Sequence, residues 1–356
     1  MSIEISEQPK KIISYREGES DHIIASLDGA HVQLMVLSSS FSFSSLSPEL
    51  SVAKNITAAA NIPSFKIFRH HIAQSILALF SAREGIVQLW QLSALTHSDT
   101  RLITNLCTIY SVEEGLSSPS LSPEDSEKVS NSNTSSRMHK IYSVLVHSSG
   151  AILTGHDDGK IKVWDYGPIL SDDVISPEQE GHYSRRTLTE SVHTIQSSPS
   201  GNLVNGLLEY CHQVGSDSGC DIVSTDTDGF IRLWRFLDHS TSNNGFQLSL
   251  VGQHKMFDHS SLCRAISSQG WLVAGGKEGN NEDNDACGLN TQVKMLNLAS
   301  LLDDGRYSSA EVKELGEPSL AVWDLKIVNS SEDEGDQHIV VSLMRRGRAW
   351  LEVWKI

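Results

Sequence analysis

The chain has 356 residues, of which 39% are hydrophobic and 6% aromatic, and its formal net charge is −16. This length is sufficient for a substantial hydrophobic core, whereas the acidic balance argues against a nucleic acid or an anionic membrane as the main partner. The longest apolar runs, such as SILALF at 75–80, are far too short to cross a bilayer. No signal-peptide pattern is evident in the polar N-terminal segment, so we expect a cytoplasmic or nuclear protein.

A hairpin pattern recurs along the chain: two short runs of alternating apolar residues flank a polar turn, and the second run ends near a large apolar residue. The copies occur at 22–37, 76–92, 151–166, 222–236, 270–298 and 338–356. The two clearest are AILTGHDDGKIKVWDY and IVSTDTDGFIRLWRF, at 151–166 and 222–236, where Asp-Gly supplies the turn. Trp90 ends the second copy, while Met35 and Leu296 replace the tryptophan in the first and fifth. Such self-similarity indicates an array of repeats.

Another strand candidate precedes most hairpins, and shorter β-prone segments follow them, so each unit is predicted to hold four antiparallel strands. The preceding candidates are KKIISYRE, SFKIFRHHI, HKIYSVLVHSSG, SVHTIQSSPSGN, SSLCRAISSQG and SLAVWDLKIV. We find no convincing amphipathic helix, which leaves an all-β sandwich, barrel or propeller, and the long repeat favours a propeller. We expect one domain over 1–356, with a disordered loop at 113–137, where apolar residues are scarce.

The two clear hairpins resemble repeats of the WD40 family. In that family a Ser or Thr on the second strand, an Asp in the turn and a Trp on the third strand form a buried hydrogen-bond network with a His ahead of the first strand. The matching residues, spaced by four and six in both copies, are Thr154, Asp158 and Trp164, and Ser224, Asp228 and Trp234. Trp90 matches the tryptophan of this set, and His139 is a rough stand-in for the histidine.

The resemblance implies a WD40-type β-propeller with six recognisable blades, and the irregular spacers leave room for a seventh. The last unit stops on its third strand, so we expect the N-terminal SIEIS segment to supply the missing outer strand and close the ring.

The sequence shows no cofactor or metal-site signature, and no P-loop, GxSxG or HExxH motif. The cysteines form no CxxC pair, which indicates reduced thiols rather than a disulfide framework or a zinc site. They are Cys107, Cys211, Cys220, Cys263 and Cys287. His70 and His71 fall on a predicted inner strand, where packing is the default interpretation and a place in the central channel the alternative. A basic cluster, Arg345, Arg346 and Arg348, fits a solvated turn better than a phosphate or acidic-peptide site.

The resemblance implies a non-catalytic scaffold that binds protein or peptide partners, acting as a monomer within a larger eukaryotic hetero-complex, and it predicts no enzyme activity. Two alternatives stay open: an adaptor of the ubiquitin-ligase type that recruits substrates or phosphopeptides, and a propeller enzyme with a hydrolase or transferase site in the channel. Partners of the family usually bind where the inner strands begin. The residues expected near that face are Tyr142, His193, Arg264 and Trp323.

Overall fold

The fold is taken from a computed structural model that describes most of the repeat strands and their shorter connections. The residues described are 11–17, 20–26, 31–37, 50–57, 64–69, 75–81, 85–92, 103–111, 139–165, 186–214, 217–239, 245–266, 270–277, 291–302, 311–316, 321–329, 337–345 and 348–355. Within these ranges, strands dominate and no helix is long and apolar enough to cross a membrane.

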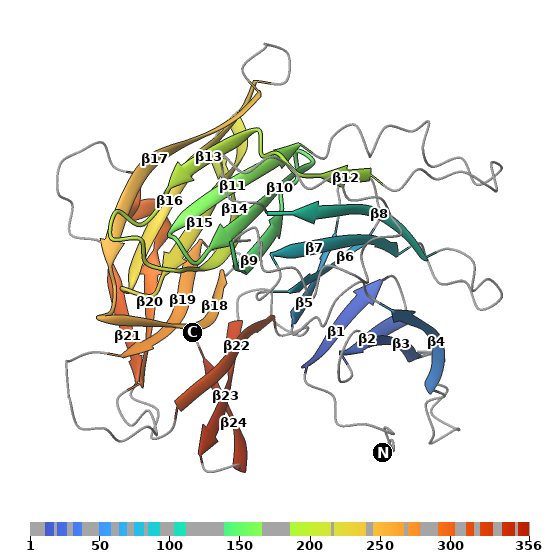
Figure 1. Ribbon diagram of the computed structural model, residues 1–356. Coiled ribbons are helices and arrows are strands. Elements are labelled where there is room, and N and C mark those ends of the chain that lie inside the picture. The colour runs from blue at the N-terminus through green and yellow to red at the C-terminus, as the bar shows by residue number, and fades with distance from the viewer. Residues whose placement is uncertain are drawn as a thin grey trace, which may run out of the picture. The chain divides into compact units, whose positions relative to one another are not determined.

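The chain forms two compact units, which we describe separately. The first comprises Met1–Ile152 and Trp164–Ser191, and the second Leu153–Val163 and Val192–Ile356. Figure 1 shows that strands close in sequence lie side by side within each sheet, as the repeated hairpins predict.

Two sheets belong to the first unit. One has the order β1-β2-β3-β4, and its strands are Lys11–Glu17, Ser20–Ser26, His31–Leu37 and Leu50–Thr57. The other has the order β12-β8-β7-β6-β5, and its strands β5 to β8 are Ser64–Arg69, Ser75–Ser81, Ile86–Leu92 and Ile103–Tyr110. Strand β12 (Arg186–Leu188) lies parallel to β8 at the edge of this sheet.

A third sheet contains the first clear hairpin and has the order β13-β11-β10-β9. Its strands are β9 (Ile141–Val146), β10 (Ala151–His156), β11 (Lys160–Asp165) and β13 (His193–Gln196). Strands β10 and β11 flank the Asp-Asp-Gly turn, which confirms the hairpin predicted at 151–166.

The remaining sheets belong to the second unit. The sheet β14-β15-β16-β17 consists of Val204–Val214, Asp217–Asp226, Phe230–His239 and Gly245–Lys255. The sheet β18-β19-β20-β21 consists of His259–Ile266, Trp271–Lys277, Thr291–Asn297 and Val312–Gly316. A short 3₁₀ helix, η5 (Leu298–Leu301), follows β20. The last sheet, β22-β23-β24, consists of Ala321–Asn329, Gln337–Arg345 and Arg348–Lys355.

Each unit has its own apolar core, supplied by the alternating positions of the strands. Nine buried residues form the core cluster of the first unit: Val87, Leu89, Cys107, Ile109, Ile141, Val144, Val146, Ile152 and Trp164. The cluster of the second unit extends from Tyr210 and Val223 through Leu233 to the residues of η5. Strand β10 is buried on both faces, because every residue of Ala151–His156 is buried.

The structure corrects three expectations from the sequence. The segment SVHTIQSSPSGN does not begin the fourth unit: its strand β13 pairs with β11, and the first strand of the next sheet is β14. The reason is local, because Ser198-Pro-Ser-Gly-Asn202 is a turn sequence that ends β13. The sheet containing β8 has five strands rather than four, one of them parallel. Finally, Cys211 and Cys220 are joined in a disulfide rather than reduced.

Several other expectations lie outside the described residues. They concern the N-terminal closing strand, the loop at 113–137, His70, His71 and Arg346. Within the described part of the last sheet, β24 pairs only with β23.

Candidate functional site

The candidate site is the end of the second unit at which the hairpin turns meet the loops that precede the next inner strands. We call it the turn face and define it as residues 157–159, 197–203, 227–229 and 256–258. Gly159 and Gly229 allow both turns to close, because their φ angles of 78° and 79° belong to the left-handed region that other residues avoid. At Gly229 a side chain is also excluded by space, since a Cβ there would lie 2.0 Å from the carbonyl oxygen of Phe257.

Backbone hydrogen bonds join the first turn to the loop that follows β13. The carbonyl of Gly159 accepts from the N–H groups of Ser197 and Ser198, at 2.9 and 3.0 Å. The side-chain amide of Gln196 donates to the carbonyls of Asp158 and Ser198, at 2.9 and 2.7 Å. Three of these hydrogen bonds therefore hold the loop to the turn, and the bond from Gln196 to the carbonyl of Ser198 lies within the loop itself.

The same loop is bonded to the second turn. The N–H of Thr227 donates to the carbonyl of Leu203 at 3.1 Å, and the amide of Asn202 donates to the carboxylate of Asp228. Beyond that turn, the N–H of Met256 donates to the carbonyl of Gly229 at 2.9 Å. All four segments of the turn face are therefore connected in series.

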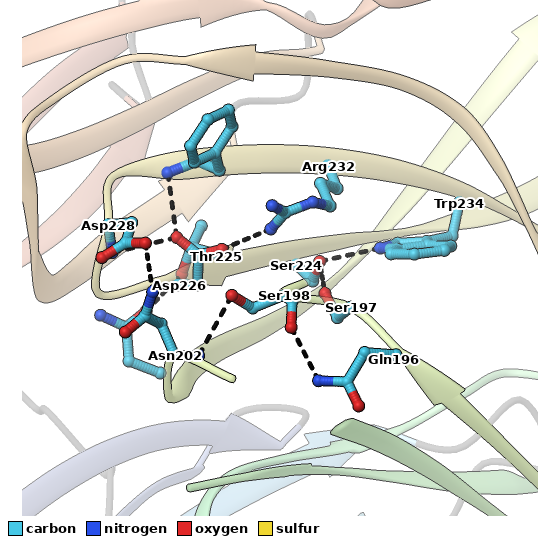
Figure 2. Close-up of polar contacts among 12 residues, drawn as sticks. Gln196, Ser197, Ser198, Asn202, Ser224, Thr225, Asp226, Asp228, Arg232 and Trp234 are labelled. Carbon is cyan, nitrogen blue, oxygen red and sulfur yellow. Dashed lines mark hydrogen bonds and ion pairs between the residues drawn. The ribbon is translucent and has the colours of Figure 1, made fainter. Parts of the chain in front are cut away.

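A buried ion pair between Asp226 and Arg232 supports the second turn. The carboxylate of Asp226 accepts from the backbone N–H groups of Asp228 and Phe230, both at 3.1 Å, and pairs with the guanidinium of Arg232 (Figure 2). Both side chains are almost fully buried, and the guanidinium also lies 4.9 Å from the ring centroid of Phe230. Because a buried charge without a partner is costly, this pair fixes both the turn and the strand that leaves it.

A second buried chain of hydrogen bonds runs through Trp234. Its indole N–H donates to the hydroxyl of Ser224 at 2.8 Å, and that hydroxyl lies 3.2 Å from the hydroxyl of Ser197 (Figure 2). The contact between indole and hydroxyl is the one implied by the family resemblance. Ser197 is the next member of this hydrogen-bond network after Ser224. The resemblance implies that Asp228 belongs to the network of Trp234, but its carboxylate accepts from the amide of Asn202.

Comparisons with known proteins support the fold. No protein-family model matches the chain, and no curated protein sequence matches it. Among solved structures, the β-propeller domain of Cps50 (Swd1) from Myceliophteria thermophila has a TM-score of 0.53 at 13% identity, over 94% of this chain and 80% of that one. Sqt1 from Chaetomium thermophilum has a TM-score of 0.53 at 10% identity, over 93% of this chain and 64% of that one. A third structure is Sqt1 bound to the N-terminus of the ribosomal protein L10, with a TM-score of 0.53 at 10% identity, over 95% of this chain and 72% of that one.

Together with the repeated antiparallel sheets and the Trp–Ser contact, these likenesses decide the architecture. The chain has the β-propeller fold.

The first clear repeat of this propeller contains a related but different hydrogen-bond network. Thr154 and His156 are fully buried and share a hydrogen bond of 2.7 Å. His156 stands where the second repeat has Asp226, two residues before the turn aspartate. The turn aspartate itself, Asp158, accepts from the N–H of Lys160 at 3.2 Å and pairs with its ammonium group at 3.2 Å.

The two remaining tryptophans of the expected network lie in the first unit. Trp164 is buried in that unit's core cluster. Trp90 pairs in register with Leu77; at this position the structure describes the strand but not the side chain.

The residues expected at the partner face lie on four different strands of the propeller. Tyr142 is on β9 and His193 on β13, and both are half-buried. Arg264 pairs in register with Ala274, and Trp323 falls at a register irregularity within β22. Of the four, only His193 lies within five residues of a turn-face segment as defined above.

Sequence reasoning missed Asn202, Ser197, Asp226 and Arg232, which hold the turn face together. Asp226 and Arg232 resemble surface residues in the sequence because charged side chains usually alternate outward along a strand. The available signal was the turn sequence Ser198-Pro-Ser-Gly-Asn202, since Asn in such turns often bonds to nearby polar groups.

The turn face is acidic. Its four segments contain Asp157, Asp158, Asp228 and Asp258 and no Lys or Arg. Lys160 pairs with Asp158, and Lys255 pairs with Asp258 at 3.1 Å, so the two lysines that flank the face offset only part of this charge. Chemically, the surface offers carboxylates and backbone groups in fixed positions, which suits recognition of a positively charged segment.

Proposed function

We propose that this propeller is a non-catalytic WD40-type scaffold that binds a protein or peptide partner at its turn face, as one subunit of a larger complex. The observation that carries the proposal is the series of hydrogen bonds that joins the four segments of that face. Loops that are ordered before binding lose little conformational entropy when a partner arrives. The complex of Sqt1 with the N-terminus of a ribosomal protein supports this use of the fold.

The charge of the turn face defines the class of partner. Four aspartates with two flanking lysines, in a chain of net charge −16, favour a segment rich in Lys and Arg and disfavour nucleic acid. Electrostatic attraction of this kind increases the association rate more than the affinity and weakens with ionic strength. We therefore propose a basic protein segment as the ligand, bound by a propeller that is itself monomeric within the complex and resides in the cytoplasm or nucleus.

A matched pair of variants tests the proposal. Ser200 on the turn face and Gln247 on β17 are both exposed, and replacing either by Arg adds one positive charge. The tagged chain is purified from cells, and its co-purifying proteins are identified by mass spectrometry and then measured one by one with purified components. S200R is expected to weaken binding by about tenfold or more, whereas Q247R changes it by less than about twofold. A chain that purifies alone, or a partner insensitive to S200R, contradicts the proposal.

An adaptor for phosphorylated segments is the second candidate. It is favoured by one observation: Arg345 and Arg348 pair directly in register where β23 and β24 turn, so two guanidinium-bearing residues flank the same turn. Arginines in this arrangement suit a phosphate group. Binding of a phosphopeptide that is lost in an R345A/R348A double variant, but kept in S200R, would favour this candidate over the first.

A further inference from the structure

Two cysteines lie directly opposite one another in the second unit. Cys211 on β14 and Cys220 on β15 form a cross-strand pair in the antiparallel register, and their sulfur atoms are bonded. Cys211 is exposed and Cys220 half-buried, so reagents in solution reach the bond. Accessible disulfides exchange readily with thiols, in contrast to those sealed within a core.

The pair stands where the four-stranded sheet divides into two strand pairs, β14–β15 and β16–β17. Strand β15 pairs with β16 only from Ile222 to Thr225, whereas it pairs with β14 from Asp226 as far as Asp217. Among the described strand pairs, the part of β15 from Asp217 to Asp221 pairs with β14 alone and so forms a two-stranded ribbon. Isolated ribbons of this length are marginally stable, so a covalent or metal cross-link at the base of the ribbon determines whether it keeps its register.

A third potential ligand lies on the same face of the ribbon. Glu209 precedes Cys211 by two residues, and the alternation of side chains along a strand places both on one side. The residues between and opposite them, Tyr210 and Asp221, are buried on the other side. One ligand atom each from Glu209, Cys211 and Cys220 lies within 4.8 Å of the other two.

We propose that these three residues form a redox-gated binding site for a thiophilic divalent cation such as Zn²⁺. In the oxidised protein both sulfurs are consumed in the disulfide and offer no thiolate. A dithiol reductant transfers two electrons and two protons to the bond, giving two cysteine thiols and its own cyclic disulfide. The cation then displaces the two thiol protons and is held by two thiolates and the Glu209 carboxylate, with water completing a tetrahedron.

The chemistry of the donors favours zinc-like ions over calcium or magnesium, because two of the three are soft thiolates. The sequence shows no CxxC spacing for such a site, since the ligands are brought together by the register of two strands rather than by proximity within one turn. The bound cation replaces the disulfide as the cross-link between β14 and β15. The two strands are therefore cross-linked in the oxidised protein and in the reduced protein with its cation, and only the reduced, metal-free protein lacks a cross-link.

Titration with Cd²⁺, which acts as a spectroscopic stand-in for Zn²⁺, tests the proposal. Protein reduced with a dithiol and then freed of it under inert gas should bind one Cd²⁺ at this site, with an ultraviolet thiolate-to-metal band and release of up to two protons. Air-oxidised protein should show neither signal from these residues. Non-reducing peptide mapping of the oxidised sample should find Cys211 linked to Cys220.

Variants assign the signal. C211S and C220S should each abolish the band. E209Q removes a direct ligand, so it should weaken binding by at least the roughly 10–100-fold that is lost with a residue that only supports a ligand. E190Q, which neutralises an exposed glutamate elsewhere in the chain, is the matched control and should change nothing. Two results would overturn the proposal: an undiminished band in a C211S/C220S double variant, or equal Cd²⁺ binding by the oxidised and reduced proteins. Because Cys211 and Glu209 are not core residues, their variants are expected to fold, and circular dichroism checks this.

Discussion

The buried ion pair between Asp226 and Arg232 offers the sharpest test of how the turn face is held in place. Replacing Asp226 by Asn keeps the size of the side chain and removes its charge. One oxygen can still accept from the N–H groups of Asp228 and Phe230. The guanidinium of Arg232, which is 4% exposed, then has no carboxylate to neutralise it.

The expected cost follows from the burial of that charge. Removing one partner of a buried ion pair typically destabilises a protein by about 3–5 kcal/mol, because the other charge stays desolvated. Replacing both partners by apolar groups is often close to neutral. D226N should therefore lower the free energy of unfolding by about 3–5 kcal/mol, and D226N/R232M should recover most of that loss. D228N, which weakens one half-buried contact with Asn202, should cost only about 1 kcal/mol.

Urea unfolding at neutral pH, followed by circular dichroism, measures these differences. Hydrogen exchange of the peptide spanning 222–234 shows whether the loss is local to the turn. The reasoning is refuted if D226N unfolds within about 1 kcal/mol of D228N, or if the double variant is less stable than D226N alone.

Three further predictions concern the second unit. G229A should destabilise the protein by more than about 3 kcal/mol, because the added Cβ would clash with Phe257. G201A is the control: Gly201 also has a positive φ, but the atom nearest to its added Cβ would be 3.8 Å away, so this variant should cost about 1–2 kcal/mol. Comparable losses for the two variants in urea unfolding would refute the clash. W234F removes an indole N–H and leaves the hydroxyl of Ser224 with one partner fewer, so it should lower the free energy of unfolding by about 1–3 kcal/mol, and an S224A/W234F double variant should cost less than the sum of the single variants. Burial, and secondarily the charge of Lys294, lowers the pKa of His254 below its ordinary value of 6.5, so protonation favours the unfolded chain. The stabilising contribution of His254 is complete above about pH 6.5 and is lost as the pH falls towards the folded pKa. H254Q should therefore flatten the dependence of unfolding free energy on pH between about pH 7.5 and 5.5, and an unchanged slope would contradict this.

The fold could be predicted from the sequence to a large extent because its repeats are local. Alternating apolar residues and Asp-Gly turns encode hairpins such as β10–β11 and β15–β16 within about fifteen residues, and both formed where expected. The errors arose where pairing is not local. Strand β13 pairs with β11 of the preceding repeat and not with the strands of the following repeat. Strand β12 pairs in parallel with β8, which lies far from it in the sequence.

The candidate site was less predictable for the same reason. The bond from Trp234 to Ser224 follows from family spacing, but the contact of Ser224 with Ser197 spans 27 residues, and that of Asn202 with Asp228 spans 26. No local pattern distinguishes Asp226, which is fully buried, from the half-buried Asp228 two residues later. Likewise, Cys211 and Cys220 meet only because β14 and β15 pair with this register.

The central claim is that a pre-ordered, acidic turn face binds a basic protein segment. It is tested most directly by measuring the affinity of the co-purified partner for wild-type protein, S200R and Q247R at two salt concentrations. The account predicts that S200R weakens binding by about tenfold or more, that Q247R does not, and that higher salt weakens wild-type binding. Equal affinities for all three proteins, or binding that is indifferent to salt, would contradict it.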